Sequence, residues 1–328
     1  MLERKKLTKV TIDFINKVAN GAYKANTIEI LVYLAEYYIK FDQILPQLDT
    51  LIHRLVETKQ TEGFEYLLKL GTDMDLRTSK KYEKFPYCTM LHIAVSVNAF
   101  DIARALLENG ARVNATDIYE NTPLHYGAMH GEIKMIELLL QFGAALDVMN
   151  KHRVQPIHSV ILSNNLECYE LLLNHMNPLN LPGGVIAILE KRTMKNFTSL
   201  LLALHKGCLD IFRLLLSKGT DVNAQDDRGR STLHIAIDQH QVEMVPLILQ
   251  HKPKINISDS FGNTAIMYAI QKGFIDIAKM LEKYGASLSG VNQKGDTLLH
   301  MAAKLDRVDM VAWLIDNGVN PFVKNSLN

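Results

Sequence analysis

The sequence has few cysteines and no excess of either charge. Cys88, Cys168 and Cys208 are the only cysteines in 328 residues, and they are too far apart for a disulfide framework or a paired-cysteine zinc site. We expect a reducing compartment, with Cys168 in the core and Cys208 at an exposed turn. Lys and Arg number 36 against 35 Asp and Glu, so nucleic acid or an anionic membrane would need a local basic patch.

The sequence also lacks long apolar runs. None reaches the roughly 18 residues of a membrane-spanning helix. The charged N-terminus is followed by polar residues rather than by the apolar stretch of a secretory signal. We therefore expect a soluble protein that does not bind a membrane.

Signatures of catalysis and of ligand binding are missing as well. The one double glycine, Gly183-Gly184, is not followed by Lys-Ser or Lys-Thr, as a phosphate-binding loop would be. Cys88 lies four residues before His92, but no orienting third group or oxyanion pocket accompanies the pair. We predict no catalytic residue, no metal site and no cofactor.

What the sequence does have is self-similarity at a period of 33 residues. The motif Thr-x-Leu-His-x-Ala begins at Thr89, and a variant with Pro in the second place begins at Thr122. Further copies follow in steps of 33 residues, apart from one step of 43. A glycine 18 residues after the anchor supports the register in five copies, and Gly71 indicates an earlier, degenerate copy. The eight anchors are residues 53, 92, 125, 158, 201, 234, 267 and 300.

Each copy predicts two short helices and a turn. In the copy anchored at 125, Thr122 caps the first helix and Pro123 occupies its first turn, and the helix ends near Gly131. A second amphipathic helix begins at Glu132 and ends at Gly143. Because one such helix pair cannot bury its apolar stripe alone, consecutive pairs must stack and share a core.

This period and motif resemble the ankyrin repeat over roughly residues 48 to 326. The resemblance implies an all-α solenoid of stacked helix-turn-helix units, in which the anchor imidazole bonds neighbouring backbone groups and is structural. We predict an array over residues 49–328 and an N-terminal helical cap or degenerate repeat over residues 1–48. Insertions interrupt the array near residues 79–86 and 177–193, and residues 185–191 of the second could add a short helix.

The resemblance also implies a concave binding surface, made of the turn tips and the exposed side of the first helices. Basic side chains interleaved with aromatic residues and methionine on that surface suit a protein interface. We predict a non-catalytic scaffold for an acidic or mixed-charge segment of another protein. The predicted partner-binding residues are Tyr119, Met129, His130, Lys151, His152, Lys195, Phe197, Lys206, Arg228 and Arg230.

Other interpretations stay open from the sequence alone. The surface could be a solvated face with scattered apolar residues. Residues 1–48 or 177–193 could form an enzyme or an enzyme regulator, and the basic stripe could bind nucleic acid or another anion with steep salt dependence. The frequent Lys, Asn and Ile and the lack of an attached enzyme or membrane domain resemble effectors that intracellular bacteria deliver into host cells. We expect a monomer in the cytoplasm, which is the host cytoplasm for a delivered effector.

Overall fold

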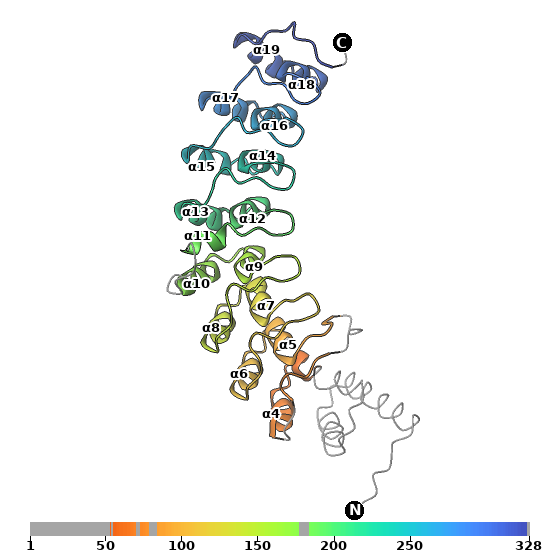
Figure 1. The fold of residues 1–328 in the computed structure, drawn as a ribbon, viewed down its shortest axis with the longest axis vertical. Helices are drawn as coiled ribbons and strands as arrows, with labels where there is room; N and C mark the ends of the chain where they lie inside the picture. The colour runs from red at the N-terminus through yellow and green to blue at the C-terminus, as the bar shows by residue number, and fades with distance from the viewer. Residues whose placement is uncertain (1–52, 54, 70–72, 79–83, 177–183, 327–328) are drawn as a thin grey trace, which may run out of the picture. The chain divides into compact units, whose positions relative to one another are not determined.

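The computed structural model describes residues 53, 55–69, 73–78, 84–176 and 184–326 (Figure 1). It divides into two units, residues 1–163 and 164–328, and each is described by itself. The predicted cap over residues 1–48, most of the 79–86 insertion and residues 177–183 lie outside the described residues. Within the described part, all regular elements are helices, with isolated β-bridges at some turns, which confirms the all-α prediction.

In unit 1, helices alternate between the first and the second member of each repeat. The first helices α5, α7 and α9 pack against one another in order, and the second helices pack behind them. The helices are α4 (Thr61–Lys69), α5 (Met90–Ser96), α6 (Phe100–Glu108), α7 (Pro123–His130), α8 (Ile133–Gln141) and α9 (Pro156–Ser163).

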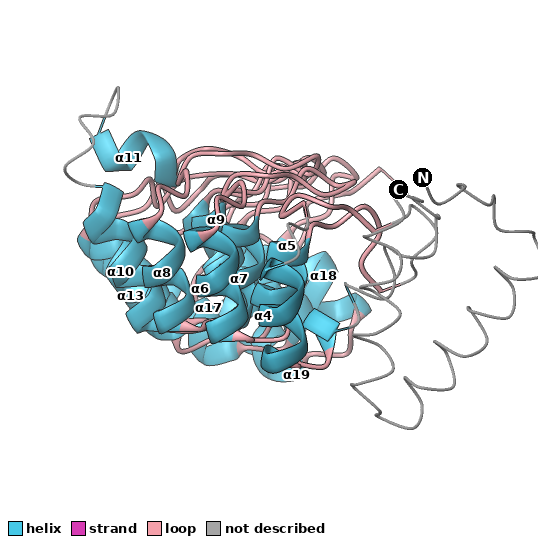
Figure 2. Ribbon diagram, turned by 90° about the horizontal axis from the view of Figure 1, so that it is seen from below, coloured by secondary structure: helices cyan, strands magenta, loops and turns pink. Residues whose placement is uncertain are grey.

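Unit 2 continues the same alternation, with α12, α14, α16 and α18 as the stacked first helices. The short helix α11 confirms the helix expected in the second insertion. In each unit, the long loops that join successive repeats project to one side of the helices (Figure 2). The helices are α10 (Leu166–Met176), α11 (Gly184–Leu189), α12 (Ser199–Lys206), α13 (Leu209–Ser217), α14 (Thr232–Asp238), α15 (Met244–Gln250), α16 (Ala265–Lys272), α17 (Ile275–Lys283), α18 (Leu298–Lys304) and α19 (Val308–Asp316).

The recurring histidine both starts its own helix and joins it to the next repeat. The N–H of Thr89 donates to Nδ1 of His92 at 3.2 Å, which completes the N-terminal cap of α5. On its other side, Nε2 of His92 donates to the carbonyl of Asn121 in the next repeat at 3.0 Å. Burial lowers the pKa of His92 to about 4, so the ring is neutral at physiological pH.

The same pair of contacts recurs along the chain. His125 reaches the carbonyl of Val154 at 3.0 Å, and His234 reaches that of Asn263 at 2.9 Å. These bonds confirm that the anchor imidazoles serve the scaffold. They also explain why the sequence motif repeats with so little change, since each ring satisfies buried backbone groups in two repeats.

The core contains the apolar side chains of both helix rows. Leu139 and Leu215 are fully buried. Cys168 is fully buried too, which confirms its predicted place in the core. The prediction of an exposed Cys208 is wrong, because this residue is only 2 % exposed. Its N–H donates to the carbonyl of Ala203 at 2.9 Å, which folds the corner between α12 and α13 back onto the core.

Candidate functional site

Five of the described turn tips are each held by one acidic or amide side chain. In the tip at residues 259–263, Oδ1 of Asp259 accepts the N–H groups of Phe261 and Asn263 at 2.9 and 2.8 Å. A backbone bond joins this tip to the next one, from the N–H of Gln293 to the carbonyl of Phe261 at 3.0 Å. The same role falls to residues 33 apart in each unit, namely Asp117 and Asn150 in unit 1, and Asp226, Asp259 and Asn292 in unit 2.

This construction fixes which side chain of each tip faces solvent. The residue two positions after the holding side chain is exposed at every one of these tips. A rigid turn therefore presents one variable side chain per repeat, which is what a recognition surface requires. These presented residues are Tyr119 and His152 in unit 1, and Arg228, Phe261 and Lys294 in unit 2.

In unit 1 the predicted partner-binding residues all lie at the surface. Tyr119 is 49 % exposed, and His152 is exposed at the adjacent tip. Lys151 is also exposed, and its Nζ donates to the carbonyl of Ile118 at 2.7 Å. Met129 and His130, also exposed, lie at the end of α7. The structure thus places five of the predicted residues on two neighbouring tips and the helix end beside them.

In unit 2 only some of the predicted partner-binding residues lie at the surface. Lys195, Lys206 and Arg228 are exposed, as expected. Phe197 is only 6 % exposed, so its prediction as a surface anchor is wrong. Its N–H donates to Oγ1 of Thr193 at 3.3 Å where the tip turns back towards α12, and its ring lies 5.3 Å from that of His205.

Arg230 is engaged inside the protein rather than free for a partner. Its guanidinium pairs with Asp226 at 2.8 Å and with Asp238 at 2.9 Å, and its side chain is 12 % exposed. Lys272 of the next repeat pairs with Asp238 at 2.9 Å. The predicted basic stripe is therefore weaker at Arg230 than the count of charged residues indicated, because two carboxylates already neutralise this cation.

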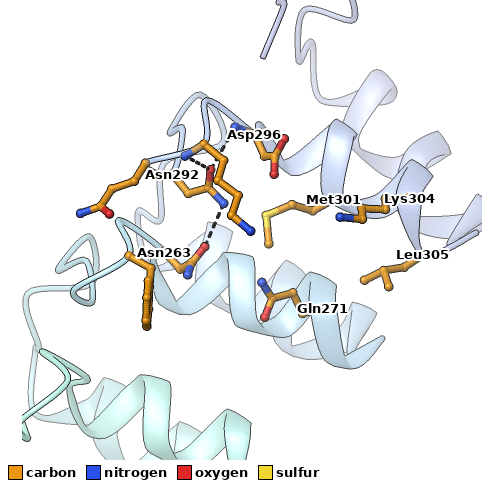
Figure 3. A pocket seen from close by; sticks show the side chains of 10 residues that line it. Asn263, Gln271, Asn292, Asp296, Met301, Lys304 and Leu305 are labelled. Atoms are coloured by element: carbon orange, nitrogen blue, oxygen red, sulfur yellow. Dashed lines mark hydrogen bonds between the residues drawn. The ribbon is translucent and has the colours of Figure 1, made fainter. Parts of the chain in front are cut away.

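A groove that the sequence interpretation missed lies between two tips and the helices α16 and α18. It has a volume of about 450 Å³. Figure 3 shows the side chains that line it. Lys294 and Lys304 bring positive charge to it, Asp296 brings one carboxylate, and Met301 contributes an apolar surface. Exposed Phe261 also lines the groove.

Amide side chains supply most of the remaining polar groups of the groove. Nδ2 of Asn292 donates to Oδ1 of Asn263 at 3.2 Å, which ties the two tips together (Figure 3). Gln271 lies on the helix side and is exposed. The signal for this groove was present in the sequence, since Phe261 and Lys294 follow the 33-residue step from Arg228.

Other kinds of chemistry find little support in the part of the chain that the structure describes. No group of three or more His, Cys, Asp and Glu residues there could hold a metal ion. Burial raises the pKa of Cys88 to about 12, so this residue is a thiol and not a nucleophilic thiolate. None of the helices described is both long and apolar enough to cross a membrane.

Comparison with known proteins identifies the family. A model of ankyrin repeats in three copies matches residues 52–150, 91–182, 124–226, 183–259 and 233–325. These matches run from residue 52 to residue 325, so the chain belongs to the ankyrin-repeat family.

Individual relatives agree with this assignment. The chain is 26% identical over 197 residues to the nuclear factor NF-kappa-B p105 subunit of Gallus gallus, which covers 60% of this chain and 16% of that protein. It is 27% identical over 180 residues to an ankyrin repeat protein of Fowlpox virus, covering 55% and 25%. The chain thus spans a quarter or less of these relatives.

A solved structure is similar as well. It is the ankyrin repeat domain of Bcl-3, described as a unique member of the IkappaB protein family. The TM-score is 0.58 at 27% identity, and the match covers 68% of this chain and 97% of that one.

Proposed function

We propose that this chain is a protein-binding scaffold whose partner docks on the face formed by the tips and the first helices. The observation that carries the proposal is the groove between the last two tips, α16 and α18, because it combines a rigid wall with exposed apolar and charged side chains. Ankyrin repeats are typically non-catalytic interaction domains, which supports the same function. Concave sites with a few placed polar groups are the usual form of binding sites.

The lining of the groove favours an extended segment with an acidic and an apolar side chain. Lys294 and Lys304 exceed the single carboxylate of Asp296 by one charge. Phe261 and Leu305 are 62 % and 43 % exposed, so they can cover an apolar side chain of the partner. Primary amides can pair with both the N–H and the C=O of an extended backbone. This chemistry supports the acidic or mixed-charge partner predicted from the sequence.

A displayed library of random peptides, selected on the full chain, tests this proposal. We expect the selected peptides to combine an acidic and an apolar residue, and Lys304→Glu or Leu305→Ala to weaken their binding by about 1 to 2 kcal/mol. Lys279→Glu, on the exposed side of α17, is the matched control and should leave binding unchanged. Selection of no peptide, or equal losses in the control, would contradict the proposal.

We also propose that the chain acts in the cytoplasm as a monomer without catalytic activity. Residence in the cytoplasm, a monomeric state and the absence of catalysis agree with a scaffold function. Delivery into a host cell by an intracellular bacterium rests on composition alone, and the two curated relatives above come from a bird and a poxvirus.

A further inference from the structure

The repeats anchored at 201 and 234 carry chemically different side chains at the same two positions. Phe197 and His205 occupy the places that Arg230 and Asp238 occupy one period later. In the later repeat the cation and the carboxylate pair at 2.9 Å, and Lys272 completes the network. In the earlier repeat the two rings pack together at 5.3 Å, and no carboxylate takes the place of Asp238.

Exposed cations around α12 have no ion-pair partner among the described residues. Lys195 at the tip and Lys206 at the end of α12 are exposed, and neither makes an ion pair with the described residues. Arg228 at the next tip is likewise exposed and unpaired there, and Asp227 beside it is the one exposed acid of residues 226–230. These three exposed cations therefore carry charge that no ion pair within the described residues neutralises.

The ring of His205 lies close to two of these cations, Lys195 and Lys206. Its Nδ1 is sealed from solvent, and no hydrogen bond from the described residues reaches it. The ring is half-buried and feels positive charge from Lys206 on its own helix, from Arg230 on the next tip and from Lys195 on its own tip. Asp226 is the opposing acid in its surroundings. An anion bound among these cations would stabilise the protonated ring.

We propose that Lys195, His205, Lys206 and Arg228 form a subsite for a carboxylate- or phosphate-bearing segment of the partner protein. This inference rests on the proposed protein-binding function and assigns a second contact region, on a different pair of repeats from the groove. Charge complementarity favours an acidic occupant, because Lys195, Lys206 and Arg228 are exposed and make no ion pair with the described residues.

The subsite makes a specific statement about pH. Partial burial and the three cations hold the pKa of His205 below its ordinary value in the free protein. A bound anion raises that pKa. Binding is therefore accompanied by proton uptake at pH values between the pKa of His205 in the free protein and its pKa in the complex. Affinity for an anion should therefore increase about threefold to tenfold between pH 7.5 and pH 5.5, since uptake of one proton can change it at most tenfold per pH unit.

The test measures binding of a fluorescein-labelled hexaglutamate peptide to the full chain, with hexaglutamine as the neutral control. A phosphoserine peptide distinguishes phosphate from carboxylate, and a single-stranded oligothymidylate tests nucleic acid. We expect Lys195→Glu and Lys206→Glu each to weaken hexaglutamate binding at least about fivefold. Lys218→Glu, at the exposed end of α13, is the matched charge control and should have little effect.

Two variants of His205 separate the subsite from general attraction. His205→Asn should abolish the pH dependence while the protein stays folded by circular dichroism. His205→Asp introduces the acid that the next repeat has at Asp238. It should weaken hexaglutamate binding as strongly as Lys206→Glu does. The inference is overturned if hexaglutamine binds as tightly as hexaglutamate, or if Lys218→Glu lowers the affinity for hexaglutamate as much as Lys206→Glu does. It is also overturned if the affinity of His205→Asn still depends on pH.

Two further outcomes are equally clear. Tighter binding of oligothymidylate than of either acidic peptide would assign the subsite to nucleic acid and overturn the protein assignment. If library peptides bind the groove but hexaglutamate does not bind the chain, this inference is wrong and the proposed function stands. If neither the library peptides nor hexaglutamate bind, the proposed function is wrong as well.

Discussion

The repeats anchored at 201 and 234 have the same order of helices and an aliphatic core each, yet they differ on the face that a partner would meet. Leu215 and Ile248 occupy equivalent positions and are both fully buried. At the tip, one repeat packs Phe197 on His205, and the other pairs Arg230 with Asp238. The comparison teaches that the scaffold needs its buried aliphatic side chains and its tip bonds, and tolerates either apolar contact or an ion pair at the surface.

The largest expected effect concerns what the two repeats share. Leu215→Ala and Ile248→Ala should each lower the free energy of unfolding by about 2 to 5 kcal/mol, because each opens a cavity in the core. Chemical denaturation followed by circular dichroism measures this loss. If either variant matched the parent protein, the equivalence of the two cores would be wrong.

A smaller loss is expected where the repeats begin to differ, at the residue that holds the tip. Asp226 is buried and accepts both backbone N–H groups and the guanidinium of Arg230. Asp226→Ala should cost about 1 to 3 kcal/mol, since it removes the acceptor of these groups and leaves a partly buried cation with a single partner.

The equivalent change in the earlier repeat is the control for this prediction. Thr193→Ala removes one hydroxyl that accepts the N–H of Phe197, and it should cost about 1 kcal/mol. Equal midpoints for the two variants in urea would show that the ionic tip is no more sensitive than the neutral one.

The ion pair also makes the stability of the later repeat depend on pH in the acid range. Although partial burial opposes it, Lys272 and Arg230 hold the pKa of Asp238 below its ordinary value. A lowered folded-state pKa adds stability above the unfolded value near 4, and that stability is lost as the pH falls through the folded pKa. Because water screens this pair, we expect less than about 1 kcal/mol.

Thermal unfolding between about pH 6 and pH 3 measures this contribution. Asp238→Asn should flatten the acid limb of the profile relative to the parent protein. An unchanged acid limb in Asp238→Asn would mean that other carboxylates account for the loss of stability.

The smallest effect on stability is expected at the exposed side chains of unit 1. Tyr119→Ala and Met129→Ala should change the free energy of unfolding by no more than about 0.5 kcal/mol, because both side chains already face solvent. A drop comparable to that of Leu215→Ala would show that these residues belong to the core and not to a surface available for binding.

Much of the scaffold was predictable because it depends on local rules that repeat. Thr122, Pro123 and His125 start a helix and satisfy its first N–H groups wherever the motif recurs, so the period predicted the helices and their order. The same register predicted which tip residues lie at the surface, as Tyr119 and Arg228 show.

The face that those residues share could be predicted less well. Phe197 and Arg230 occupy equivalent positions, but one is buried against a ring and the other is neutralised by two carboxylates. Cys208 was misplaced for a similar reason, since the direction of a side chain at a corner depends on how the chain folds back.

The sequence by itself determined the repeat, its helices, the aliphatic core and the histidines that link one copy to the next, because each follows from spacing along the chain. Only the tertiary structure decided which charges are free. Arg230 meets Asp238 within its repeat and Lys272 reaches the same carboxylate from the next, whereas Lys195 and Lys206 meet no acid among the residues described. Coulomb energies depend on distances of a few ångströms between side chains from different elements, and a count of charged residues does not contain those distances.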